Sequence, residues 1–170
     1  MTRDPGTLVV SLAEVKAYLR LEHGEDDGML AGFVRTAMAL CEAFTGQWLI
    51  VRVGVQRLDA DTGWQRLGIA PVVEITGVDC ADGSLPAADY ETDIDAAGTG
   101  WVRLKAPIIG ARATARAGLG DDWNDLPEPL RQGIIRLVAH LHAHRDAADA
   151  GPPPTAVAAL WRPWRRLRLK

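Results

Sequence analysis

The spacing of apolar residues changes twice along this 170-residue chain, and this double change constrains the fold more than any single motif. Apolar residues recur at helical spacing up to residue 45, alternate with polar residues from 48 to 118, and return to helical spacing after 127. The alternating stretch contains no helical pattern, so its strands can pair only as antiparallel neighbours. We therefore predict an α+β fold in which helices pack with an antiparallel β meander or small barrel.

Two helices are predicted before the alternating stretch, over residues 12–22 and 27–45. Ser11 can accept hydrogen bonds from the free amides of the first helix, and Glu14, three residues later, completes a capping box. Gly46 follows the last apolar residue of the second helix and supplies the left-handed conformation that commonly ends helices. The join between the two helices is short, so they are predicted to form an antiparallel hairpin.

The β-rich insertion covers residues 48–118. Its clearest strand is the first, in which Leu49, Val51, Val53 and Val55 alternate with Ile50, Arg52, Gly54 and Gln56. The segments VVEITGV, GWVRLK and ARATARAG are further strand candidates, and turn-forming residues separate them. These segments complete the predicted antiparallel unit.

A third long helix is predicted over residues 128–145, with two prolines near its start, where missing amides do no harm. The stretch DAADAGPPP then forms a stiff linker. We therefore predict a single body, residues 1–149, followed by an extended C-terminal arm, residues 150–170. In this arm Thr155 can cap a short helix, and the residues from 166 to 170 alternate basic and apolar as an added strand would.

The arm differs sharply in charge from the body. Residues 1–149 hold 14 basic and 22 acidic residues, a net charge of −8, whereas the arm holds five bases and no acid. Such polarity between segments is typical of an interaction tail. The predicted partner-binding residues are Leu160, Trp161, Arg162, Pro163, Trp164, Arg165, Arg166, Leu167, Arg168, Leu169 and Lys170.

Three histidines on the third helix are the strongest candidates for a metal site. His140 and His144 lie one helical turn apart and could share a metal ion, whereas His142 points elsewhere. No Asp or Glu stands at the spacing that metalloprotease helices use, so the histidines are interpreted as boundary or interface residues. We predict no metal site.

Acidic residues cluster at 59–61, 93–95 and 121–125. Each cluster lies in a predicted turn or at a helix start, where Asp accepts hydrogen bonds from local amides without any catalytic task. The chain also lacks a phosphate-binding glycine pattern and a Ser or Cys in a nucleophile context. We therefore predict no catalytic residues, no cofactor and no enzymatic activity.

The sequence has no apolar run long enough to cross a membrane, and its N-terminus lacks the layout of a signal peptide. Cys41 and Cys80 lie in different predicted elements and are expected to be buried thiols rather than a disulfide. These features favour a cytoplasmic protein that does not engage membranes.

Taken in order, several short motifs resemble the head-tail connector, or adaptor, proteins of tailed bacteriophages and related gene transfer agents. They are Leu12-x-x-Val15-Lys16-x-Tyr18-Leu19-Arg20, the acids at 25–27, Glu42-x-x-Thr45-Gly46, PVVEITGV, Asp89-Tyr90, Ala117-Gly118-x-Gly120, Pro127-x-x-Leu130-Arg131-Gln132, and Leu160-x-x-Pro163-Trp164-Arg165-Arg166-x-Arg168. The resemblance spans nearly the whole chain.

This resemblance implies a structural virion protein assembled as a ring, usually of twelve copies, beneath the portal of a DNA-filled head. It implies a portal protein and a tail-completion or stopper protein as partners, and DNA that passes through the lumen without sequence-specific binding. It also implies that the C-terminal arm docks on the portal. Such a protein is expected in the bacterial cytoplasm during assembly and afterwards in the virion or gene transfer agent particle.

A different function is also open. Arginines interleaved with aromatic residues can grip nucleic acid, with Arg on phosphates and Trp stacked on bases. On this interpretation the arm would be the DNA-binding element of a packaging or regulatory protein.

Overall fold

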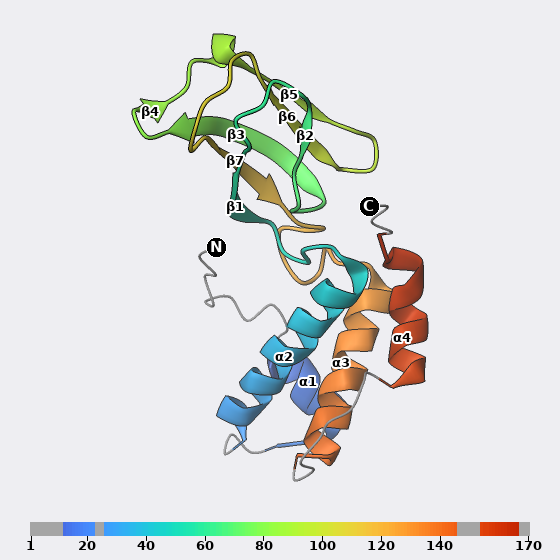
Figure 1. Ribbon diagram of the computed structural model, residues 1–170. Helices are drawn as coiled ribbons and strands as arrows, with labels where there is room; N and C mark the ends of the chain where they lie inside the picture. Colours follow the sequence, from blue (N-terminus) through green and yellow to red (C-terminus); the bar gives the residue numbers. More distant parts are fainter. Residues whose placement is uncertain (1–11, 23–25, 146–153, 167–170) are drawn as a thin grey trace. The chain divides into compact units, whose positions relative to one another are not determined.

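The computed structural model describes residues 12–22, 26–145 and 154–166, which form two compact units (Figure 1). Among these residues, the helical unit comprises 12–46 and 122–166, and the β unit comprises 47–121. These boundaries differ from the predicted division into a body, residues 1–149, and an arm, residues 150–170. The α+β class predicted from the spacing of apolar residues is confirmed.

The helical unit contains α1 (Leu12–Leu19), α2 (Asp27–Thr45), α3 (Glu128–Ala143), α4 (Thr155–Trp161) and a short 3-10 helix, η2 (Arg162–Trp164). Helix α3 contacts the other three α-helices. Helix α1 ends three residues before the predicted boundary, because Arg20 adopts a left-handed conformation, with φ 56°.

The apolar stripes of α2 and α3 form the centre of this unit. The buried residues on the two helices are Leu30, Ala31, Val34, Ala37, Cys41, Leu130, Ile134, Ile135, Leu137 and Val138. Each buried Leu, Ile or Val contributes roughly 1.5–3 kcal/mol relative to exposure. Cys41 lies in this core as a free thiol, and burial raises its pKa well above the usual range.

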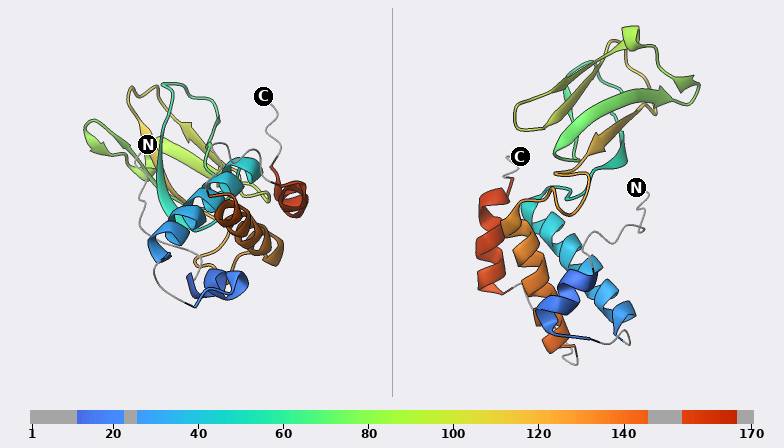
Figure 2. Two further views of the ribbon diagram at one scale, coloured as in Figure 1. Left: turned by 90° about the horizontal axis from the view of Figure 1, so that it is seen from below. Right: turned by 180° about the vertical axis from the view of Figure 1, so that it is seen from behind.

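The C-terminal segment differs from the predicted extended arm. Helix α4 forms as expected, but it packs along α3, as the view from behind in Figure 2 shows, and Val157 and Trp161 are buried. The predicted cap is also different: Thr155 is the first helical residue, and Pro154 precedes it without a side-chain capping bond. Residues 167–170, which were expected to alternate like a strand, lie outside the described residues.

The β unit contains two sheets. The larger has the order β1–β7–β3–β4, formed by Arg52–Arg57, Arg112–Ala117, Val72–Cys80 and Gly83–Ser84. The smaller has the order β2–β6–β5, formed by Gln65–Arg66, Gly100–Leu104 and Tyr90–Ile94. A 3-10 turn, η1 (Ala87–Asp89), precedes β5. All strand pairs are antiparallel, but β1 pairs with the distant β7, which a meander would not do.

The two sheets share one hydrophobic core. Residues of the larger sheet, such as Ala113, Ala115 and Val78, pack in the same cluster as Val102 and Leu104 of the smaller sheet. Side chains alternate between the two faces of a strand, so the neighbours of these residues point outward. The outer faces of the two sheets therefore point away from each other.

The valines of strand β1 do not face the core, although their alternation in the sequence suggests that they would. Val53 and Val55 are 62% and 55% exposed, whereas Gly54 between them is buried. A side chain at Gly54 would collide with the Trp48 ring, since an added Cβ would lie 2.6 Å from its nearest atom. Trp48 therefore covers the core side of β1, and the valines remain on the outer face.

Candidate partner-binding surface

Trp161, one of the residues predicted to bind a partner, is buried within its own chain. Its exposed fraction is 0%, and its ring lies 5.9 Å from the Phe44 ring on α2 and is tilted by 57°. Its Nε1 donates a 3.4 Å hydrogen bond to the carbonyl of Leu130 on α3. The structure thus gives Trp161 a role in folding, because docking of α4 on α3 already removes the ring from solvent.

Gly133 makes this docking possible. An added Cβ at position 133 would lie 2.1 Å from Nε1 of Trp161, a distance that no real contact reaches. Gly133 lies within α3, where glycine costs up to about 1 kcal/mol relative to alanine. The close approach of the Trp161 ring explains why glycine stands there.

The residues after Trp161 lie at the C-terminal end of α2. The amide of Arg166 donates a 2.8 Å hydrogen bond to the carbonyl of Thr45, which is among the last carbonyls of that helix. The Arg165 guanidinium carbon lies 5.7 Å from the Phe44 ring centroid, within cation–π range. Both arginines carry positive charge where the α2 dipole is negative, and this placement is stabilising.

The surface that remains for a partner is smaller than the predicted set. Within residues 160–166, Arg162, Pro163 and Arg165 are exposed, whereas Leu160, Trp164 and Arg166 are half-buried. We call residues 162–166 the basic segment. It presents three arginines from a short stretch that η2 and the Thr45–Arg166 hydrogen bond hold in place. Leu167, Arg168, Leu169 and Lys170 lie outside the described residues.

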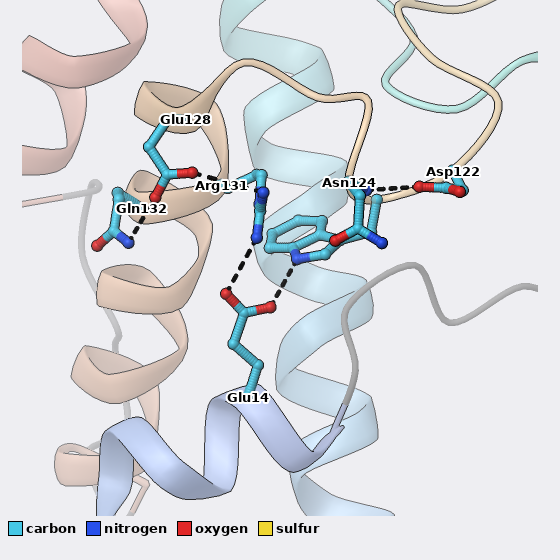
Figure 3. A network of polar contacts seen from close by, with 7 residues as sticks. Glu14, Asp122, Asn124, Glu128, Arg131 and Gln132 are labelled. Carbon is cyan, nitrogen blue, oxygen red and sulfur yellow. Dashed lines mark hydrogen bonds and ion pairs between the residues drawn. The ribbon is translucent and has the colours of Figure 1, made fainter.

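A polar network also fixes the N-terminal end of α3 (Figure 3). Glu14 on α1 accepts hydrogen bonds from Trp123 Nε1 at 2.7 Å and from Arg131 Nη2 at 3.3 Å. Arg131 also pairs with Glu128 at 3.5 Å, and its guanidinium lies 5.3 Å from the Trp123 ring centroid. Glu14 was predicted to complete a capping box, but its carboxylate joins α1 to α3 instead. Ser11 lies outside the described residues.

The three histidines do not converge on one point. The rings of His140 and His144 lie with centroids 4.2 Å apart and are tilted by 38°, and His144 Nδ1 lies 2.8 Å from the His140 carbonyl oxygen. His142 Nε2 is buried and has no hydrogen-bond partner among the described residues. In that part of the chain, no group of three His, Cys, Asp or Glu side chains is placed to hold a metal ion.

Several carboxylates of the acidic clusters accept hydrogen bonds from amides in turns, as predicted, whereas Asp121 pairs with Arg116 at 3.7 Å. Asp61 accepts from the Gly63 amide, and Asp122 accepts from the Asn124 amide. Asp95 accepts from the amides of Thr99 and Ala97 at 2.8 and 2.9 Å, and these bonds, led by the one from Thr99, lower its pKa. Asp93, by contrast, lies within β5 rather than in a turn and is exposed.

The sequence reasoning missed the contacts that close the helical unit. Gly133 and Trp161 stand 28 positions apart, and no local pattern pairs them. Glu14 likewise stands 109 positions before Trp123 and 117 positions before Arg131. The glycine inside the amphipathic helix α3 was the sequence signal of a close approach by another element.

No helix among the described residues combines the length and apolar character needed to cross a membrane. No protein-family model matches the chain, and no curated protein matches its sequence.

Solved structures do match. A chain in the neck of an empty gene transfer agent (GTA) particle, determined with C6 symmetry, is 28% identical with a TM-score of 0.77, over 99% of this chain and 95% of that one. A chain in the neck of a native GTA particle, determined with C12 symmetry, is 29% identical with a TM-score of 0.77, over 100% and 95%. A chain in the virion of a native GTA particle is 29% identical with a TM-score of 0.76, over the same shares. The predicted resemblance to head-tail connector proteins is thereby confirmed.

Proposed function

We propose that this protein is a non-enzymatic component of a bacteriophage-like gene transfer agent or phage particle. It forms a ring in the neck, joins the portal of a DNA-filled head to the tail, and lets DNA pass through its lumen. The observation that carries this proposal is the likeness to neck chains over 95% of their length. A likeness of that extent covers both the helical unit and the β unit.

The symmetry of the similar particles supports the ring. Two of the matching necks were determined with C6 and C12 symmetry, and a ring of twelve copies satisfies both. Cyclic arrangements arise when one surface of a subunit binds a different surface of the next and the rotation closes. We therefore expect a dodecamer, assembled in the cytoplasm and retained in the particle.

The basic segment is the proposed contact with the portal. Arg162 and Arg165 are exposed, and their neighbour Trp164 is half-buried, so a partner can add to a surface that is already ordered. Ordering before binding reduces the entropy lost on docking. Arginine is also among the residue types that dominate interface hot spots. A portal surface with acidic groups or free carbonyls would complement this segment, and a tail-completion or stopper protein would bind elsewhere on the ring.

Charge reversal at the basic segment tests the portal contact. We expect Arg162→Glu with Arg165→Glu to leave the chain folded and to abolish its retention on portal-bearing heads, as seen by electron microscopy of assembled particles. Arg136→Glu, at an exposed position on α3, is the matched control and should join heads to tails normally. Normal head-tail joining by the double variant would refute portal docking through this segment.

The same variants separate portal docking from DNA binding. A DNA-binding element predicts retention of linear DNA by the wild-type protein, with an affinity that falls steeply with salt and is lost in the double variant. The burial of Trp161 removes one of the two aromatic rings that this alternative requires for base stacking. DNA retention without portal retention would replace the proposed function.

A further inference from the structure

The outer face of the larger sheet carries an apolar centre beside two positive charges. Val53 and Val55 of β1 are exposed, and Arg57 follows them on the same face of the strand. Arg57 lies directly opposite Arg112 of β7 in the register, and both are exposed. We call these four residues the valine–arginine face.

Two of its features are unfavourable for an isolated chain. Like charges directly opposite each other on neighbouring strands destabilise a sheet, and neither Arg57 nor Arg112 has an ion-pair partner among the described residues. Nearby Arg116, by contrast, pairs with Glu74 at 3.4 Å and Asp121 at 3.7 Å. Asp79 of β3 lies opposite Arg112 in the register, but it accepts a hydrogen bond from Ser84 and forms no ion pair with Arg112, so neither Arg57 nor Arg112 is paired among the described residues.

The outer face of the smaller sheet carries acidic residues of β5 beside two arginines, Arg66 on β2 and Arg103 on β6. Asp93 on β5 and Asp89 in η1 are exposed, and neither has an ion-pair partner among the described residues. Glu91 lies between them and pairs with Arg103. Trp64, 45% exposed, stacks against Arg103 at 5.1 Å and gives this side an apolar component. We call Trp64, Asp89, Glu91 and Asp93 the tryptophan–aspartate face.

Resting on the ring proposed above, we infer that the valine–arginine face of one copy binds the tryptophan–aspartate face of the next copy. The two faces lie on sheets that pack core to core, so they point away from each other and cannot meet within one chain. Between two copies the apolar parts can meet, and the unpaired Asp89 and Asp93 of one face can pair with Arg57 and Arg112 of the other. This is the form of contact that closes a ring rather than a two-fold dimer.

The valines favour a protein partner over DNA. A phosphate backbone would satisfy Arg57 and Arg112 but would leave two exposed valines in water. An indole side chain such as Trp64 can cover them, and aromatic residues are enriched where interfaces are fully buried. The neighbouring copy therefore accounts for the whole face, whereas DNA accounts only for its charge.

Charge reversal with rescue tests this contact. The variants are Arg57→Glu with Arg112→Glu on one face, Asp89→Arg with Asp93→Arg on the other, and all four changes together. Each copy contributes one of each face, so a change on either face weakens every interface in the ring. We expect each two-site variant to lower the ring fraction about tenfold or more, and the four-site variant to recover it. Ring fraction is measured by native mass spectrometry, in solution or on portal-bearing heads, wherever the wild-type protein assembles.

A second pair of variants tests the apolar centre. Val53→Thr with Val55→Thr should also lower the ring fraction, whereas Ile109→Thr, at a loop position that is 84% exposed and outside both faces, should not. Circular dichroism and urea unfolding of each variant confirm that the chain remains folded. These controls separate loss of the contact from loss of the fold.

The results can contradict the inter-sheet contact without contradicting the ring function. If wild-type rings form and the charge-reversal variants form them equally well, the inter-sheet contact is wrong and the ring function stands. Loss in both two-site variants without recovery in the four-site variant likewise overturns the pairing. If the wild-type protein forms no ring in solution or on heads, both fail. Salt-sensitive DNA binding that disappears with Arg57→Glu and Arg112→Glu, while rings persist, would assign the face to nucleic acid.

Discussion

The C-terminal helix and the first strand of the β unit treat their apolar side chains in opposite ways. Helix α4 carries Trp161 to 0% exposure against α2 and α3, whereas β1 leaves Val53 and Val55 more than half exposed. The sequence suggested the reverse, a free basic arm and an ordinary strand. An apolar residue near a chain end can thus complete a fold, whereas an apolar residue inside a sheet can remain exposed on its outer face.

The largest loss of stability is expected when the buried Trp161 ring is removed. Trp161→Ala should lower the free energy of unfolding by about 3–5 kcal/mol, because it leaves a cavity between α3 and α4. Urea unfolding followed by circular dichroism measures the change. Trp164→Ala, at a half-buried position, is the control and should cost clearly less.

Gly133→Ala should act in the same direction through overpacking, at a cost of about 1–3 kcal/mol. If Trp161→Ala changed stability no more than Trp164→Ala did, α4 would be an arm after all. Deletion of residues 155–170 should accordingly destabilise the helical unit as well as remove the basic segment.

A smaller effect is expected where α1 joins α3. Glu14→Gln removes the charge that receives Arg131 and weakens the bond from Trp123, so it should cost about 1–3 kcal/mol. The charge-matched control is Glu22→Gln at an exposed position. Equal unfolding midpoints for the two variants would show that the network in Figure 3 adds nothing to the stability of the helical unit.

How far the sequence predicts this molecule depends on the range of the contacts involved. Helices α2 and α3 were predictable because their buried residues repeat every three or four positions, and Gly46 marks the end of α2. The docking of α4 was not, because it depends on Gly133 and Trp161, which only the folded chain brings together. The face of β1 was not predictable either, since Gly54 and the Trp48 ring, rather than the valines, complete its core side.

Substitution of the exposed valines is expected to change the stability of the isolated chain very little. Val53→Thr and Val55→Thr should each change the free energy of unfolding by no more than about 0.5 kcal/mol, because both side chains already contact water. The measurement is urea unfolding at a concentration where the chain is monomeric. A loss of about 2 kcal/mol or more in the free energy of unfolding, on the scale of a buried valine, would mean that these residues stabilise the fold of the single chain.

The smallest effect separates two neighbouring aspartates of the β unit. The amides of Thr99 and Ala97 lower the pKa of Asp95 in the folded chain, so this carboxylate contributes stability that is present above the unfolded pKa of about 3.9. That contribution is lost as the pH falls through the lower, folded pKa, because protonation then removes the acceptor for both amides. Asp95→Asn should flatten the fall in stability over this acidic range, measured by thermal unfolding against pH. Asp93→Asn should leave the monomer's stability unchanged near neutral pH and weaken the ring instead, because Asp93 has no ion-pair partner among the described residues and Asp95 is committed to its own turn.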